Sequence, residues 1–381
     1  MAPAHSDMTA AGAVWGNSWD LEVPLYFAPQ GFAETPSLKR SNSFDIVGGE
    51  CRAVRENVGL LDITGFSRFE VSGPNAEAWL NSVFATKLPA PGRVRLAVAL
   101  GHDGRLKGDL TLFNWGDGTW WIMGSYYLRR WHMRWFDDHM QDGVTIRDLG
   151  EEMAGFSLSG PNSRAVIERL TDGPVGDLSF MGCGNFDIGL IRAKVGRLSV
   201  TGEAGYEISC RMGDHIALRR LLLAVGFKVN IREYGFNALL SLRLEKSFGI
   251  WSAEFTQLYT PGMTGMDRFL DWNRDDFIGH AAARAERDGT GPEKKLVTLA
   301  VQASDADASG YEPVWSGGRL VGFVTSGGYG HTTGQSLAMA MVNTDLCVEG
   351  TKLSVHVVGA EQRAEVIAPS LYDPAGAAMR V

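Results

Sequence analysis

The pattern of apolar and polar positions predicts strands and helices over most of the chain, and strands alone near its end. Residues 93–100 and 109–113 alternate as strands do, and His102-Asp103-Gly104 between them has hairpin-turn chemistry. Residues 126–140 instead carry apolar side chains at helical spacing. Further helices are predicted at 50–58, 215–225 and 236–248, and strands at 198–200, 296–301, 320–325, 336–342, 353–358 and 364–367.

One phrase occurs twice in the chain. Phe69-Glu70-Val71-Ser72-Gly73-Pro74-Asn75 returns as Phe156-Ser157-Leu158-Ser159-Gly160-Pro161-Asn162, at an offset of 156 − 69 = 87 residues. In each copy a short strand meets a Gly-Pro turn, after which Asn can cap a helix, at 76–83 and at 163–170. The repeat predicts a duplicated strand-turn-helix unit. Two such units side by side form a pseudo-symmetric disc with a central crevice, which is a natural place for a ligand.

Shifts in composition divide the chain into three regions. Residues 1–40 are rich in Ala, Pro, Gly and Ser and are expected to form an N-terminal arm. Residues 41–285 hold the repeat and are expected to form a pair of domains. Residues 281–295 are charged and Gly-rich, which indicates a linker. Residues 295–381 contain strands and Gly-rich turns without a helix, as in a small barrel or sandwich.

Charge and cysteine content exclude several classes of protein. The net charge of −8 argues against a nucleic-acid groove or an anionic membrane surface, since both need a basic patch. No apolar run approaches the roughly 20 residues of a membrane span, and residues 1–16 lack the features of a signal peptide, so a cytoplasmic protein is expected. The four cysteines have no CxxC spacing, so neither a disulfide framework nor a metal site is predicted.

Redox chemistry by this chain alone is not expected. Two segments begin like dinucleotide-binding loops, at Gly182-Cys183-Gly184 and Gly328-Tyr329-Gly330, but neither supplies the third glycine. The remaining chemistry lies in four acids: Asp109, Glu203, Glu207 and Glu245.

Asp109 stands out among these acids because its strand has buried-looking neighbours. The period of two places Asp109, Thr111 and Phe113 on one face, where a carboxylate is costly unless it has a function or a partner. A turn or capping role is the alternative for Asp109, and a structural hydrogen bond is the alternative for Glu207. For Glu245, an ion pair with Arg243 or Lys246 is an equally good explanation.

Several motifs in one order resemble a known family. They are the repeated F-x-x-S-G-P-N, the D-L-T strand at Asp109, T-G-E-x-G-Y-E at 201–207, L-R-L-E-K at 242–246, D-F-I-G at 276–279, G-Y-G-H-T-x-G-x-S-L-A at 328–338 and L-Y-D-P at 371–374. From about residue 24 to the end, the chain resembles the glycine-cleavage T-protein (aminomethyltransferase) superfamily. Within it, the chain looks closest to the folate-binding part of dimethylglycine and sarcosine dehydrogenases and to tetrahydrofolate-dependent demethylases.

The resemblance implies an α+β fold: a three-domain cloverleaf with tetrahydrofolate in its central channel and a C-terminal β-barrel. Asp109 matches the catalytic acid beside the reacting folate nitrogens, and Glu207 matches the acid that holds the pterin. One carboxylate can accept both the amide N–H and the exocyclic amine of a pterin edge. The other cofactor-binding candidates are Val200, Tyr206, Arg243 and Trp251, and the substrate candidates are Tyr126, Tyr127, Trp121 and His331.

Val200 is the main departure from the family pattern. The family usually has a tyrosine at this position, seven residues before Glu207. The absence of the tyrosine hydroxyl argues against the glycine-cleavage intermediate as substrate. Lys294-Lys295 lies near the position of the family's basic cluster but has few basic companions, so docking on a lipoyl protein is not expected.

The function expected from these features is tetrahydrofolate-dependent one-carbon transfer by a demethylase. Its substrate would be a small methylated N-, S- or O-compound, and the folate product would carry a methyl or a methylene group. One alternative is a folate-trapping subunit whose flavoprotein partner makes the iminium donor. Another is a non-catalytic, folate-binding regulatory protein. Such relatives carry K-G-C-Y-x-G-Q-E where this chain has residues 200–207, so the presence of Asp109 favours the enzyme.

Overall fold

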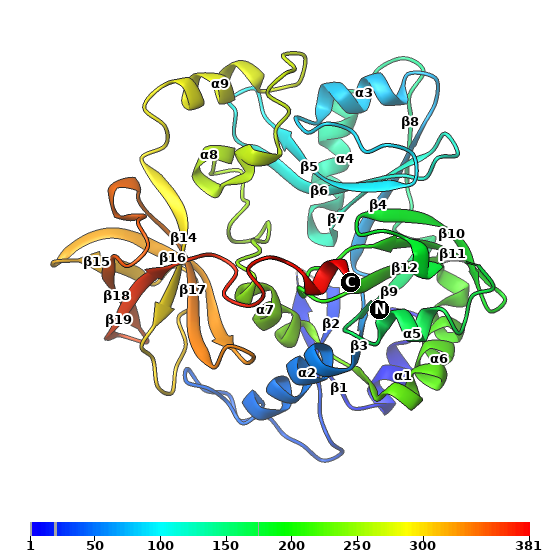
Figure 1. Ribbon diagram of the computed structural model, residues 1–381, viewed down its shortest axis with the longest axis horizontal. Coiled ribbons are helices and arrows are strands. Elements are labelled where there is room, and N and C mark those ends of the chain that lie inside the picture. Colours follow the sequence, from blue (N-terminus) through cyan, green and yellow to red (C-terminus); the bar gives the residue numbers. More distant parts are fainter. Residues whose placement is uncertain (1, 19–20, 174) are drawn as a thin grey trace.

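A computed structural model describes residues 2–18, 21–173 and 175–381 and has an α+β fold with three lobes around a common centre (Figure 1). The helices are α1 (His5–Ala10), α2 (Phe44–Glu56), α3 (Ala76–Val83), α4 (Arg129–Asp138), α5 (Ser163–Ile167), α6 (His215–Gly226), α7 (Phe236–Glu245), α8 (Pro261–Thr264) and α9 (His280–Asp288). The strands outside the C-terminal lobe are β1 (Ala13–Ser18), β2 (Leu21–Phe27), β3 (Val58–Asp62), β4 (Phe66–Ser72), β5 (Arg93–Leu100), β6 (Leu106–Asn114), β7 (Trp120–Ser125), β8 (Thr145–Asp148), β9 (Met153–Ser159), β10 (Gly182–Ile188), β11 (Ile191–Arg197), β12 (Gly205–Arg211) and β13 (Ile231–Glu233).

The duplicated phrase builds two matching halves of one mixed sheet. In the described ranges this sheet has eleven strands in the order β13-β3-β9-β12-β11-β10-β5-β6-β7-β4-β8. From the middle of the sheet outward, the strand order is β5-β6-β7-β4 on one side and β10-β11-β12-β9 on the other. In each half, three consecutive strands are thus followed by the strand that precedes them in the chain. The halves meet where Arg93 of β5 pairs with Gly182 of β10. Both phrase glycines have positive φ, 112° at Gly73 and 134° at Gly160, so the two Gly-Pro turns share a backbone conformation.

Each half-sheet has an outer face under helices and an inner face that points toward the other half. Helices α3 and α4 pack on the outer face of the first half, and α5 and α6 on that of the second. On the inner side, Arg68 of β4 donates a hydrogen bond to Ser209 of β12. A side chain at Gly196 of β11 would lie 2.6 Å from the ring of Phe113 on β6. The sheet therefore folds back on itself, and its inner faces enclose the middle of the two halves.

The C-terminal lobe is a closed, six-stranded antiparallel barrel with an apolar interior. Its strands follow the order β14-β17-β16-β15-β18-β19, and β19 returns to pair with β14. They are β14 (Lys294–Val301), β15 (Pro313–Ser316), β16 (Arg319–Gly330), β17 (Gln335–Asn343), β18 (Lys352–Val357) and β19 (Ala360–Ile367). Figure 1 shows the barrel at the left, the first half-sheet at the top and the second at the right, with α7 between them. The C-terminal segment returns to α7, where Lys246 donates to the carbonyl of Tyr372 at 2.9 Å.

Most of the elements expected from periodicity are present, but the capping prediction is wrong. Helix α3 has the expected bounds, and α5 ends three residues early, at Ile167. Asn75 and Asn162 each precede a helix, yet neither side chain caps it. The amide of Asn75 donates instead to the carbonyl of Asp142, because that loop closes over the Gly-Pro turn.

Two other local predictions are also wrong. The strand expected at 198–200 is a loop, because β11 already ends at Arg197. The linker expected at 281–295 is largely the helix α9, since its Ala, Arg and Glu residues favour helix and only the Gly-rich part that follows is irregular. Across the described residues, the helices are too short or too polar to traverse a bilayer.

Candidate functional site

Asp109 lies on the inner face of the first half-sheet. Its strand neighbours Leu110 and Leu112 point the other way, into the core under α3 and α4. Val98 stands opposite Asp109 on β5 and belongs to an apolar cluster with Trp251, and Phe113 further along β6 belongs to a second apolar cluster. The period-2 prediction for this strand is therefore confirmed.

A short part of this inner face is left open between the two apolar clusters. Leu96, Asp109 and Thr111 are only partly buried there, whereas the flanking inner-face residues Val98 and Phe113 are buried. We call these three residues the inner-face gap. The gap lets a carboxylate in the middle of a sheet remain accessible to a small molecule.

Burial, with a smaller contribution from the negative charge of Glu254, raises the pKa of Asp109 to about 7, against a hydrogen bond from its own backbone N–H that lowers it. The side chain keeps some accessible surface, yet protein surrounds it closely enough to remove much of its hydration. Tyr127 lies close enough that the charge of Asp109 adds to burial in raising the tyrosine pKa. A carboxyl group with a pKa near neutrality can both stabilise a cation and take up a proton.

Glu207 occupies the inner face of the second half-sheet. It stands opposite Ser157 of β9 and Gly196 of β11, and its side chain is 8% exposed. Burial raises the pKa of Glu207 to about 7, and the positive charge of Arg68 opposes that rise. Within residues 2–18, 21–173 and 175–381, neither carboxylate oxygen of Glu207 accepts a hydrogen bond. The residue is largely buried, but its carboxylate oxygens keep some accessible surface and are free to accept hydrogen bonds, so this position favours a ligand that brings its own donors.

Three of the aromatic candidates lie at different places around the inner-face gap. Trp251 lies in the apolar cluster beside Asp109 and contacts the ring of Trp131, with centroids 5.7 Å apart. Tyr126 is partly buried at the start of the short 3-10 helix η1 (Tyr126–Leu128), next to Tyr127. Trp121 lies in the cluster on the other side of the gap, where its indole N–H donates to Glu70 at 3.2 Å.

The structure does not bring the other four predicted residues to the inner faces. Tyr206 points away from Glu207 into the core under α5 and α6. Val200 packs against the cluster formed around α2 and α7. Arg243 of α7 is buried in an ion pair with Glu254, at 3.2 Å. His331 packs against Phe44, with ring centroids 4.6 Å apart.

Glu245 forms an ion pair with a residue that sequence reasoning did not name. Its carboxylate contacts Arg55 of α2 at 2.8 Å, and neither Arg243 nor Lys246 is its partner. Arg55 also contacts Glu203 at 3.0 Å. The alternative of an ion pair with Arg243 or Lys246 is therefore wrong, because α7 packs against α2 and this packing brings Glu245 to Arg55.

Arg68 and Glu254 are two further charged residues that sequence reasoning missed near the site. For Arg68 a signal was present: in Phe66-Ser67-Arg68-Phe69-Glu70, alternation places Arg68 on the face opposite the buried Phe69. For Glu254 no periodic signal exists, because it lies in the irregular segment after α7.

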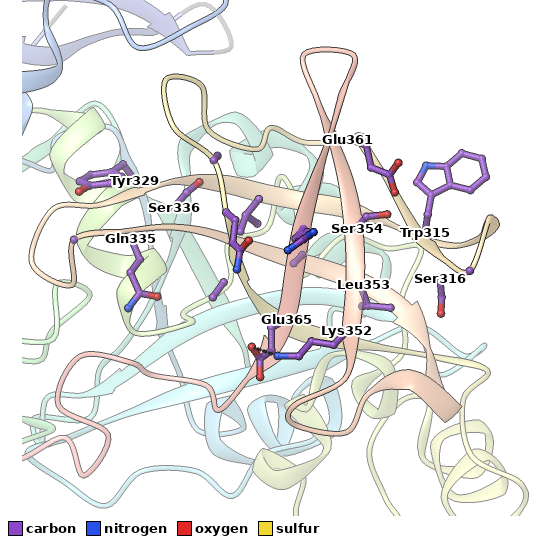
Figure 2. Close-up of a pocket in the computed structure, with 18 of the residues that line it drawn as sticks. Trp315, Ser316, Tyr329, Gln335, Ser336, Lys352, Leu353, Ser354, Glu361 and Glu365 are labelled. Atoms are coloured by element: carbon purple, nitrogen blue, oxygen red, sulfur yellow. Dashed lines mark ion pairs between the residues drawn. The ribbon is translucent and has the colours of Figure 1, made fainter.

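A cavity of about 1000 Å³ lies on the barrel, away from both acids (Figure 2). Its wall has mixed charge and includes the ion pair between Lys352 and Glu365, and none of the predicted site residues lines it. The described residues contain no group of three His, Cys, Asp or Glu side chains placed to hold a metal ion.

Comparison with known proteins gives matches along nearly the whole chain. The model of the GCVT N-terminal domain matches residues 4–274, and that of the glycine cleavage T-protein C-terminal barrel domain matches residues 294–373. Mitochondrial dimethylglycine dehydrogenase from Mus musculus is 30% identical over 370 residues, which are 95% of this chain and 42% of that protein. The chain thus spans less than half the length of this relative.

Two bacterial proteins match at nearly full length. An aminomethyltransferase from Geobacillus sp. (strain WCH70) is 27% identical over 333 residues, covering 86% of this chain and 91% of that protein. The crystal structure of glycine cleavage system aminomethyltransferase T from Bartonella henselae has a TM-score of 0.86 and 22% identity, and the match covers 98% of both chains. At 22% identity, the likeness to the Bartonella henselae structure shows that the fold is shared and nothing more.

Proposed function

The chain belongs to the glycine-cleavage T-protein family, and from that premise we propose that it is a tetrahydrofolate-dependent one-carbon transferase. Its second substrate would be a small methylated N-, S- or O-compound. The observation that carries the proposal is the pair of desolvated carboxylates, Asp109 and Glu207, on the inner faces of the duplicated sheet.

The residues present fit tetrahydrofolate. Glu207 is a largely buried residue whose carboxylate oxygens remain accessible and receive no hydrogen bond from the described residues, and a pterin edge offers an amide N–H beside an amine. Bound tetrahydrofolate would supply the nucleophilic nitrogen that accepts the one-carbon unit. Glu207 would orient the pterin by accepting its two N–H donors. Asp109 would stabilise a cationic donor in the inner-face gap and take up the proton released on transfer.

A second candidate function follows from the partial match to dimethylglycine dehydrogenase. A separate flavoprotein would generate the iminium donor, and this chain would trap the one-carbon unit on tetrahydrofolate. Both candidates use the same residues and differ in the source of the donor.

We would incubate the protein with tetrahydrofolate and a panel of N-, S- and O-methyl compounds and identify the folate product by mass. A methylated folate formed without a flavoprotein supports the first candidate, and a product that needs one supports the second.

The proposed role of Asp109 predicts a pH dependence. Its pKa of about 7 lies above the usual value, so the ionised form is lost as the pH falls below neutrality. At saturating tetrahydrofolate, kcat/KM for the one-carbon donor should rise about tenfold per pH unit below about pH 7 and then level off. The Asp109→Asn variant should lack this limb. A wild-type profile that stays flat through neutrality would contradict the assignment.

Glu207→Gln should weaken tetrahydrofolate binding by about 1–3 kcal/mol, because the amide cannot accept both donors of the pterin edge. Calorimetric titration measures the loss. Glu151→Gln is a matched control, since Glu151 is exposed and pairs only with Arg129 at the surface. Equal affinities of the Glu207 variant and the wild type would remove Glu207 from the binding site.

A further inference from the structure

Arg68 is a fully buried arginine that reaches from the first half-sheet onto the second. Its side chain is 0% exposed. Nε donates to the hydroxyl of Ser209 on β12 at 3.2 Å, and the two terminal nitrogens donate to the carbonyls of Phe66 and Ile63 at 2.9 and 3.0 Å. These three bonds fix the guanidinium against the inner face that carries Glu207.

The duplicated unit does not repeat this contact, because only the first half supplies an arginine. The position equivalent to Arg68 is 68 + 87 = 155, which is Gly155. A Cβ atom at Gly155 would lie 2.4 Å from the carbonyl oxygen of Ile208 on β12 and 3.2 Å from a terminal nitrogen of Arg68, so a side chain there would clash with the neighbouring strand and crowd the arginine. Trp121 of β7 stands opposite Glu70 of β4, and Glu207 of β12 stands opposite Ser157 of β9. Because 70 + 87 = 157, Trp121 is the counterpart of Glu207 in the first half. The second half therefore has a glycine where the first has the buried arginine, and the first half has a tryptophan where the second has the carboxylate.

Arg68 lies close enough to Glu207 to act on its charge. Ser209 is two residues beyond Glu207 on the same face of β12, a separation of about 6–7 Å along a strand. Burial lowers the pKa of Arg68 only to about 10, so it stays charged at neutral pH. The positive charge of Arg68 accordingly lowers the pKa of Glu207, since an opposite charge nearby in a desolvated site favours the ionised form of a carboxyl group.

The other titratable groups near this pair do not supply a positive charge. Asp62, at the end of β3, adds negative charge beside Arg68. His215 of α6 contacts Asp62 at 3.6 Å, and burial lowers the pKa of His215, which favours its neutral form. Tyr234 follows β13, and burial raises its pKa so that it too stays neutral. Among the described residues, Arg68 is the cation that offsets the burial of Glu207.

We propose that Arg68 is a positioning residue that keeps Glu207 ionised and thereby sets the lowest pH at which the protein binds the pterin edge of tetrahydrofolate. This role rests on the proposed function. It acts through the charge of Arg68 on Glu207, and each of the three guanidinium nitrogens already donates one hydrogen bond, to Ser209 or to a carbonyl.

The test compares the pH dependence of binding in the wild type and in Arg68→Met. Tetrahydrofolate affinity is measured anaerobically by calorimetry from about pH 5.5 to 9, across the pKa of Glu207 of about 7. Below that pKa the affinity of the wild type should fall about tenfold per pH unit. Loss of Arg68 should move the midpoint upward by about one unit or more, which weakens binding at pH 7 about fivefold or more and leaves it nearly unchanged at pH 9.

A second readout does not depend on the ligand. Selective ¹³C labelling of glutamate carboxyl groups, with Glu207→Gln to assign the signal, gives the Glu207 titration by NMR. The midpoint should rise in Arg68→Met and in Arg68→Gln, which keeps an uncharged NH₂ donor group and serves where the Met variant does not fold. Arg68→Lys should restore a lower midpoint. Arg219→Met is the matched control: Arg219 is buried in an ion pair with Glu233, its charge acts on His215 and not on Glu207, and its loss should not move the Glu207 titration.

The outcomes separate this role from the proposed function. A loss of affinity by one factor at every pH, or an unmoved Glu207 midpoint, would show that Arg68 is structural only and would overturn the inference. If wild-type protein fails to bind tetrahydrofolate, the proposed function fails, whereas the NMR titration still decides whether Arg68 governs the charge of Glu207.

Discussion

Asp109→Asn is expected to lower kcat for one-carbon transfer by about 10²–10⁴-fold while leaving tetrahydrofolate affinity nearly unchanged. The two side chains have nearly the same shape, so the strand and the inner-face gap should be preserved. The amide, however, carries no charge to stabilise a cationic donor and has no site for the released proton. Product formation at saturating substrates measures the first effect, and calorimetry measures the second.

Asp103→Asn is the matched control for this variant. Asp103 lies in the exposed turn between β5 and β6, at the end of the hairpin that carries Asp109. Its replacement should leave both kcat and affinity at wild-type values. If the Asp109 variant turned over at the wild-type rate, the catalytic assignment would fail. If it lost folate binding in proportion to its rate, Asp109 would be a binding residue instead.

Local sequence patterns predicted the frame of the site because they depend on short-range physics. The repeated phrase predicted two equivalent units, and both units appear in one sheet with the same strand connectivity. Alternation along β6 predicted that Asp109 faces away from Leu110 and Leu112, which follows from the geometry of any strand. The motifs also predicted the family and the C-terminal barrel.

Long-range partners could not be predicted in this way. Glu245 pairs with Arg55, which is 190 residues away, and only the packing of α2 against α7 brings them together. Tyr206 belongs to the same family motif as Glu207, but it points to the opposite face, since adjacent strand residues alternate. Arg68 required knowledge that the sheet folds back, because its partner Ser209 lies on the other half.

Arg55→Met is expected to destabilise the protein by about 3–5 kcal/mol, because it leaves two buried carboxylates without their cation. Arg55 is 6% exposed and contacts Glu203 at 3.0 Å and Glu245 at 2.8 Å. Its guanidinium also lies 3.8 Å from the ring centre of Tyr372, in the returning C-terminal segment. The arginine therefore joins α2, the loop before β12, α7 and the chain end. Urea unfolding followed by tryptophan fluorescence measures the loss.

The size and the pH dependence of this loss distinguish a buried network from a surface pair. Arg220→Met is the control, since Arg220 is 68% exposed in its pair with Asp7 and its replacement should cost less than about 1 kcal/mol.

Burial already raises the pKa of Glu203, and without Arg55 this pKa should rise further. The folded variant then binds more protons than the unfolded chain at pH values above the ordinary pKa of glutamate. The deficit of Arg55→Met should then shrink as the pH falls. Replacing Glu203 and Glu245 by Gln in the same variant should recover part of the stability, because no unpaired charge remains buried. If Arg55→Met costs no more than the surface control, the network does not hold these elements together.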